Sequence, residues 1–166
     1  MAPVRIDASH FSPDTRDFIR LLHSHDVRYL IVGGEAVIFH GHARLTGDVD
    51  FFFGRDPANI EHLFAALEAF WEGDVPGLTS AAELSPDGTI VQFGQPPNRI
   101  DLINAIGGVG FDEAWDRRVE AILSLGGREL RVPFIGLDAL VKNKRAVGRP
   151  KDLDDLSYLT GGESPR

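Results

Sequence analysis

Two aspartates one residue apart, Asp48 and Asp50, open an apolar run that continues to Phe53. Such a run predicts a strand, and side chains along a strand alternate between its two faces. Both carboxylates therefore point the same way, and their mutual repulsion costs free energy. A divalent cation is the usual reason to keep two carboxylates together, so the pair indicates a metal site.

A third carboxylate, Asp101, lies in the middle of a later strand predicted over 99–103. Leaving a carboxylate unpaired in a buried strand is costly. If this strand neighbours the one that carries Asp48 and Asp50, the three carboxylates converge and can hold two Mg²⁺ ions. Two such ions stabilise the transition state of phosphoryl transfer, and Asp101 would lower the pKa of an acceptor hydroxyl, directly or through the metal.

Two glycines, Gly33 and Gly34, follow the buried strand predicted at 29–32 and precede a short helix predicted over about 34–41. Glycine lets the backbone approach a phosphate closely, and the N-terminus of the helix directs N–H groups at it. We therefore expect a triphosphate to lie with its oxygens on this turn and on the metal ions.

Arg44 and Thr46 flank the entry to the strand that carries Asp48. They are candidates for phosphate contacts. In the alternative interpretation they pair with Asp101 and cap the loop. Asp101 itself would then be a structural carboxylate, paired with Arg44 or Arg99.

Lys144 falls on the apolar stripe of a helix predicted over 136–147, where a lysine needs an anionic partner. This position could carry it to the triphosphate, where it would neutralise charge on the leaving pyrophosphate. Arg149 follows the break at Gly148 and either contacts the nucleotide or pairs with an aspartate between two helices.

The composition is that of an ordinary globular chain, with 166 residues, 43% apolar and 25% charged residues. We expect one domain over 1–160 and a flexible tail at 161–166. The absence of cysteine is consistent with a cytoplasmic location, and no apolar run is long enough to span a membrane. The net charge of −8 argues against bulk electrostatic binding of nucleic acid.

The hydrophobic pattern predicts an α+β fold, with a small mixed sheet of about five strands flanked by helices. A glycine hairpin turn is expected at Gly126-Gly127. The predicted strands lie at 29–32, 48–53, 89–93, 99–103, 119–125 and 128–132, and the predicted helices at 13–25, 34–41, 111–117 and 136–147, with two more that begin at Pro57 and Pro150.

The turn Gly33-Gly34, the motif Asp48-Val49-Asp50 and the later Asp101, in this order, resemble the signature of the DNA polymerase β-like nucleotidyltransferase superfamily. The chain is similar above all to its small single-domain bacterial members. Relatives of these include toxin components of toxin–antitoxin systems and enzymes that modify aminoglycoside or lincosamide antibiotics. The similarity spans roughly 30–160 and extends to Arg44-x-Thr46-x-Asp48, Gly107–Trp115 and Asn143–Leu153.

The resemblance implies a nucleotidyltransferase fold that binds ATP or another NTP with Mg²⁺. It implies that Asp48 and Asp50 are metal ligands, that Asp101 is a ligand or general base, and that Gly33 and Gly34 face the triphosphate. The reaction would transfer a nucleoside monophosphate to a hydroxyl with release of pyrophosphate. Many active members carry Gly-Ser at the turn, where the serine hydroxyl contacts a phosphate, so here that contact must come from elsewhere.

Two other functions remain open. The first is a non-catalytic nucleotide-binding or toxin–antitoxin interaction module of the same fold, and the second is a metal-dependent phosphohydrolase or nuclease. The acceptor is a small cationic molecule, a protein or tRNA, the last favoured only by the basic residues of 142–151. A second copy of the chain or an antitoxin-type partner could complete an open cleft.

Overall fold

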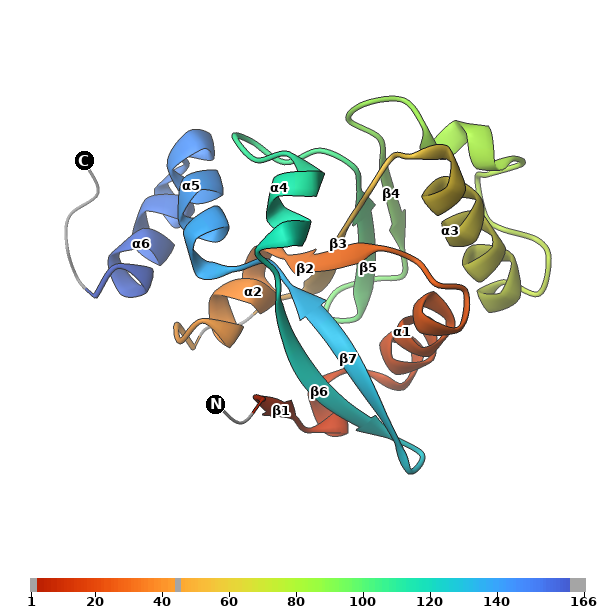
Figure 1. The fold of residues 1–166 in the computed structure, drawn as a ribbon, viewed down its shortest axis with the longest axis horizontal. Helices are drawn as coiled ribbons and strands as arrows, with labels where there is room; N and C mark the ends of the chain where they lie inside the picture. Colours follow the sequence, from red (N-terminus) through yellow and green to blue (C-terminus); the bar gives the residue numbers. More distant parts are fainter. Residues whose placement is uncertain (1–2, 44–45, 162–166) are drawn as a thin grey trace.

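The computed structural model describes residues 3–43 and 46–161. Arg44 lies outside the described residues, as does the predicted tail beyond Gly161. The α+β prediction is confirmed, because a seven-stranded mixed sheet is flanked by helices (Figure 1). The strands are β1 (Arg5–Ile6), β2 (Tyr29–Val32), β3 (Asp48–Phe53), β4 (Ile90–Phe93), β5 (Arg99–Ile103), β6 (Val119–Leu125) and β7 (Arg128–Phe134).

The helices follow the sequence signals closely. In α1, Pro13 occupies the first turn and the Ser12 hydroxyl accepts a hydrogen bond from the backbone N–H of Thr15. None of the described helices is long and apolar enough to cross a membrane. The helices are η1 (Ala8–His10), α1 (Pro13–Ser24), α2 (Gly33–Phe39), α3 (Pro57–Phe70), η2 (Ala81–Leu84), α4 (Phe111–Asp116), α5 (Leu137–Val147) and α6 (Pro150–Leu159).

The strand order is β1-β6-β7-β2-β3-β5-β4. The expected count of about five strands was too low. The hairpin β6–β7 joins the same sheet through the pairing of β7 with β2, and the two-residue β1 adds a parallel edge beside β6. The pair β4–β5 is antiparallel, whereas β3 and β5 run parallel.

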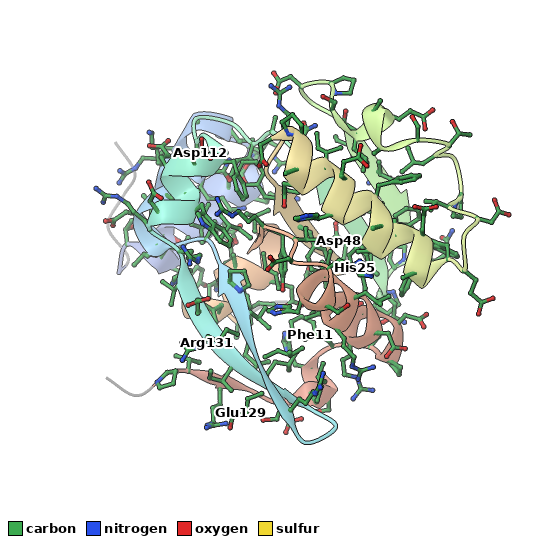
Figure 2. The ribbon with its side chains drawn as sticks, turned by 45° about the vertical axis from the view of Figure 1, so that its right-hand side comes forward. Phe11, His25, Asp48, Asp112, Glu129 and Arg131 are labelled. Carbon is green, nitrogen blue, oxygen red and sulfur yellow. The ribbon has the colours of Figure 1, made fainter. Side chains whose placement is uncertain are left out.

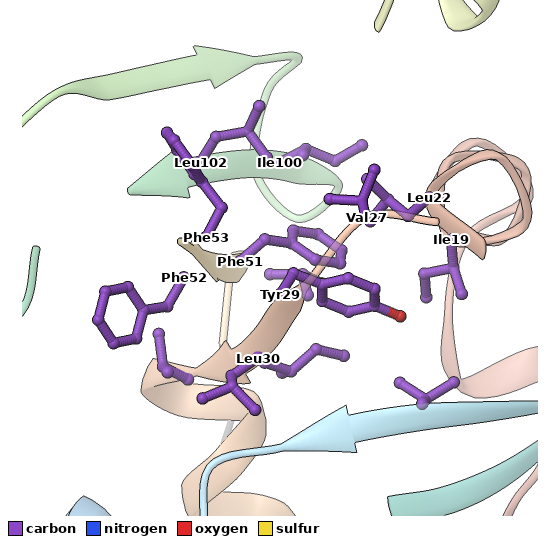
Figure 3. Close-up of a cluster of buried hydrophobic side chains, with 14 of the residues drawn as sticks. Ile19, Leu22, Val27, Tyr29, Leu30, Phe51, Phe52, Phe53, Ile100 and Leu102 are labelled. Atoms are coloured by element: carbon purple, nitrogen blue, oxygen red, sulfur yellow. The ribbon is translucent and has the colours of Figure 1, made fainter. Parts of the chain in front are cut away.

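The helices form two groups on opposite sides of the central strands. In Figure 1, α1 and α3 lie to the right of β2 and β3, and α2, α4, α5 and α6 lie to the left. The apolar core between the sheet and α1 and α3 is rich in aromatic rings (Figure 3). Phe18 of α1 packs edge-to-face against Phe51 of β3 and Phe70 of α3, with ring centroids 5.3 Å apart in each pair.

Strand β3 therefore has two different faces. Val49, Phe51 and Phe53 alternate with Asp48, Asp50 and Phe52, so one face of the strand is apolar throughout while the other begins with two carboxylates. Phe52 contacts the ring of Phe111 in α4 at a centroid distance of 5.3 Å. The carboxylates accordingly lie on the side of the sheet covered by α2, α4, α5 and α6.

A buried ion-pair cluster joins α5 to α6. Gly148, with φ of 67°, ends α5, and the chain then turns into α6. Lys144 is 4% exposed, and its Nζ lies 3.0 Å from Asp152 Oδ1 and 3.1 Å from Asp155 Oδ2. Burial alone would raise the pKa of Asp152, but hydrogen bonds from Arg149 and Lys144 lower this pKa to about 2.

Replacing Lys144 by alanine should destabilise the protein by about 3–5 kcal/mol, because buried carboxylates would lose their counter-charge. The matched change Lys142→Ala breaks an ion pair with Glu113 in which both side chains are more than half exposed. It should cost no more than about 1 kcal/mol. Urea denaturation measures both values, and equal costs would contradict the structural role of Lys144.

Candidate active site

The parallel pairing of β3 with β5 brings the three predicted carboxylates together. Asp48 lies opposite Arg99 and Asp50 opposite Asp101 in the strand register. One ligand atom each from Asp48, Asp50 and Asp101 lies within 4.8 Å of the other two. The sequence predicted this convergence only on condition that the two strands were neighbours, and they are.

This arrangement is electrostatically unfavourable for Asp50. Burial, and then the negative charges of Asp48 and Asp101, raise the pKa of Asp50 to about 8. Burial also raises the pKa of Asp101 above its ordinary value. With no added cation, Asp50 therefore keeps its proton at neutral pH.

Arg99 is the site residue that sequence reasoning treated only as a structural alternative. Its Nε donates a hydrogen bond to Asp101 Oδ1 at 2.8 Å, and its Nη2 donates to Asp101 Oδ2 and Asp48 Oδ2 at 3.0 Å each. The signal was present in the sequence, because Arg99 and Asp101 are two residues apart on one strand and so share a face. The alternative pairing of Asp101 with Arg99 is thus part of the same site as the triad.

Two further polar side chains contact the carboxylates of the triad. The Thr46 hydroxyl donates to the Asp48 carbonyl oxygen at 3.2 Å and lies 3.3 Å from Asp48 Oδ1. Gln92 of β4 donates to Asp101 Oδ2 at 3.4 Å. Thr46 therefore orients a carboxylate of the triad within the protein.

Gly33 begins α2 directly beside Asp50, because the last residue of β2, Val32, pairs with Asp50 across the sheet. Gly33 has φ of 65°, and a Cβ at this position would overlap Asp50 Oδ2. Gly34 is buried in the first turn of the helix. No side chain caps this N-terminus, so the first N–H groups of α2 have no side-chain partner among the described residues.

The two predicted C-terminal cations have different surroundings. Lys144 is enclosed with Asp152 and Asp155. The pKa of Arg149 is raised mainly by its hydrogen bond to Asp152 and also by the charge of Asp50. Arg149, whose side chain is 56% exposed, is therefore the described cation of α5 and α6 that the triad influences.

The donor set of the triad fits a hard divalent cation. Carboxylate oxygens are the ligands that Mg²⁺ prefers, and a cation would remove the repulsion that raises the pKa of Asp50. A second group, His42 with Asp154 and Asp155, also lies close enough to share an ion. Both groups already contain a protein cation, because Lys144 lies 3.1 Å from Asp155 and Arg99 lies 3.0 Å from Asp48.

Replacing Gly33 by alanine should destabilise the protein by about 1–3 kcal/mol more than Gly126→Ala, because only the first change overpacks the site. Gly126 has a similar φ of 55°, and a Cβ there would meet nothing within 4 Å. The pair of variants separates the clash with Asp50 from the strain of a left-handed alanine. Equal free energies of unfolding in urea would contradict the close approach of Gly33 to Asp50.

Replacing Asp50 by asparagine should raise the melting temperature by more at pH 9 than at pH 5 when divalent cations are chelated. The pKa of Asp50 is about 8 in the folded protein, whereas an unfolded aspartate has a pKa of about 3.9. Ionisation of Asp50 therefore destabilises the fold as pH rises through this window, and asparagine avoids it. The exposed Asp74→Asn serves as control. A pH-independent difference between Asp50→Asn and the wild type would disprove the raised pKa.

Comparison with known proteins identifies a family for the chain. No curated protein matches the sequence. A family model described as "Nucleotidyltransferase of unknown function (DUF6036)" matches residues 14–159, which include every described residue of the triad, the glycine turn and the α5–α6 pair. The chain therefore belongs to this family of nucleotidyltransferases.

Proposed function

We propose that the protein is a Mg²⁺-dependent nucleotidyltransferase of the DNA polymerase β-like type. It would transfer a nucleoside monophosphate from an NTP to an acceptor hydroxyl. The observation that carries the proposal is the convergence of three carboxylates, from two neighbouring strands, beside a glycine turn that opens a helix. Membership of a nucleotidyltransferase family supports it.

Asp48, Asp50 and Asp101 would hold one or two Mg²⁺ ions. Bound there, Mg²⁺ would supply Lewis-acid stabilisation of the charge that develops on the phosphate oxygens. Burial, and then the charges of Asp48 and Asp101, raise the pKa of Asp50, and a bound cation would offset the part that comes from these charges, which supports the assignment.

The chain itself supplies a base and phosphate contacts. An acceptor hydroxyl oxygen attacks the α-phosphorus, the bond from that phosphorus to the β-phosphate oxygen breaks, and pyrophosphate leaves. Asp101 takes the hydroxyl proton, and burial makes it a stronger base by raising its pKa. The N–H groups of Gly33 and Gly34 would bind phosphate oxygens.

Among the basic candidates, Arg149 is the better placed for the triphosphate. Its side chain is 56% exposed and within electrostatic reach of Asp50. Contact of Lys144 with nucleotide would require its buried pairs with Asp152 and Asp155 to break, so Lys144 is assigned to the helix pair. Thr46 would act through Asp48, and a phosphate contact from Arg44 remains part of the proposal.

Adding NTP with Mg²⁺ should raise the melting temperature of the wild type. At a free concentration of about 100 times Kd, binding stabilises by about 2.7 kcal/mol. For a domain of this size that corresponds to roughly 5–10 °C. The double change Asp48→Asn with Asp50→Asn should abolish the shift, and the exposed Asp74→Asn should retain it. No shift with any of the four NTPs at millimolar concentration would count against the proposal.

Turnover separates this enzyme from a binding module of the same fold. Pyrophosphate release is followed over a panel of acceptors that contains aminoglycoside-like cations, proteins and tRNA. Mass spectrometry then locates the transferred nucleotide. A melting shift without turnover on the whole panel would favour the interaction module, and NTP hydrolysis without an acceptor would favour a phosphohydrolase.

A further inference from the structure

Arg99 uses both carboxylate oxygens of Asp101. Nε donates to Oδ1 at 2.8 Å and Nη2 donates to Oδ2 at 3.0 Å, so the guanidinium forms a bidentate ion pair with this carboxylate. Nη2 also reaches Asp48 Oδ2 at 3.0 Å. The guanidinium therefore already occupies the position of a cation between two of the three acidic side chains.

Among the described contacts, Arg99 donates no hydrogen bond to Asp48 Oδ1 or to the carboxyl group of Asp50. Asp48 Oδ1 lies 3.3 Å from the Thr46 hydroxyl. A divalent ion could be held by Asp48 and Asp50 with Arg99 in place. An ion that also uses Asp101 would lie within a few ångströms of the guanidinium, and the two positive charges would repel each other.

We propose that Arg99 is a resident counter-cation that withholds Asp101 from the metal site and is displaced when a divalent ion binds to all three carboxylates. In the protein without metal, Arg99 offsets part of the repulsion among Asp48, Asp50 and Asp101. Its departure would free Asp101 as a ligand and as a proton acceptor. The inference rests on the proposed function, since it assumes that the triad binds a metal ion.

The surroundings of Arg99 allow this exchange. Its side chain is 31% exposed, whereas the Asp101 side chain is 7% exposed. The guanidinium can therefore move into water while Asp101 stays in place. An arginine that moves into water regains hydration, which offsets part of the ion-pair energy that it loses.

Binding of Mn²⁺ to the protein without nucleotide tests the proposal. Arg99→Gln should lower the apparent Kd for Mn²⁺, measured by electron paramagnetic resonance, by about tenfold or more, because no charge-assisted bonds have to be broken. Arg99→Lys keeps the charge but cannot form the bidentate ion pair. Its Kd for Mn²⁺ should lie between those of Arg99→Gln and the wild type. The control Arg131→Gln removes the same charge from an exposed position on β7, which Figure 2 shows well apart from Asp48, and should leave the Kd unchanged.

A measurement on the wild type covers the case in which Arg99→Gln fails to fold. The Arg99 Nε–H is hydrogen-bonded to Asp101 and should give a protected side-chain resonance in ¹⁵N spectra, identified by its absence in Arg99→Lys. Saturating Mg²⁺ should abolish that protection. A resonance that stays protected, or Mn²⁺ binding to Arg99→Gln no tighter than to the wild type, would overturn the displacement.

The outcomes distinguish this inference from the proposed function. If the wild type and folded Arg99→Gln bind Mn²⁺ equally well, Arg99 does not compete, and the metal site stands. If neither binds Mn²⁺ while both remain folded, the metal site and the role of Arg99 both fall.

Discussion

Repulsion among Asp48, Asp50 and Asp101 is built into the sheet, and the rest of the site follows from it. The register of β3 with β5 places Asp50 directly opposite Asp101. A slip of one residue would turn one strand over and bring its apolar face out of the core. The ring of Phe51 contacts the rings of Phe18 in α1 and Tyr29 in β2. This core packing fixes the register of β3. Hydrophobic burial on one face of β3 thus holds together carboxylates that would otherwise separate.

The protein relieves this repulsion in three ways that do not need a metal ion. Arg99 places a positive charge between Asp48 and Asp101. Asp50, which Arg99 does not reach with a hydrogen bond, keeps a proton because its pKa is about 8. Glycine at position 33 leaves room for the Asp50 carboxyl group beside the first turn of α2. Among residues 3–43 and 46–161, no cation forms a salt bridge with Asp50, which lies next to the glycine turn.

Local signals were sufficient to predict most of the elements, but not how they pair. Alternation along β3 was enough to place Asp48 and Asp50 on one face, and Ser12 with Pro13 marked the start of α1. The pairing of β3 with β5 is non-local, since Asp48 and Arg99 are 51 residues apart, and no periodicity encodes it. The two-residue β1 is too short to show a period. Lys144 was correctly predicted to need an anionic partner, yet the sequence could not decide between a phosphate and the aspartates of α6 that the structure places beside it.

The overall charge of the protein gives the triad a further constraint. With a net charge of −8, the chain repels a free nucleotide triphosphate at long range, and screening by salt removes only part of this repulsion. Local cations must therefore supply the attraction. Among the described candidate cations of the site, Lys144 is paired with Asp152 and Asp155, and Arg99 with Asp48 and Asp101. Arg149 is partly exposed and lies within electrostatic reach of Asp50. Arg149, itself bonded to Asp152, cannot alone balance the charge of a triphosphate. Any nucleotide that binds beside Gly33 should accordingly arrive with, or require, a divalent cation, so that metal and nucleotide affinity are coupled by charge.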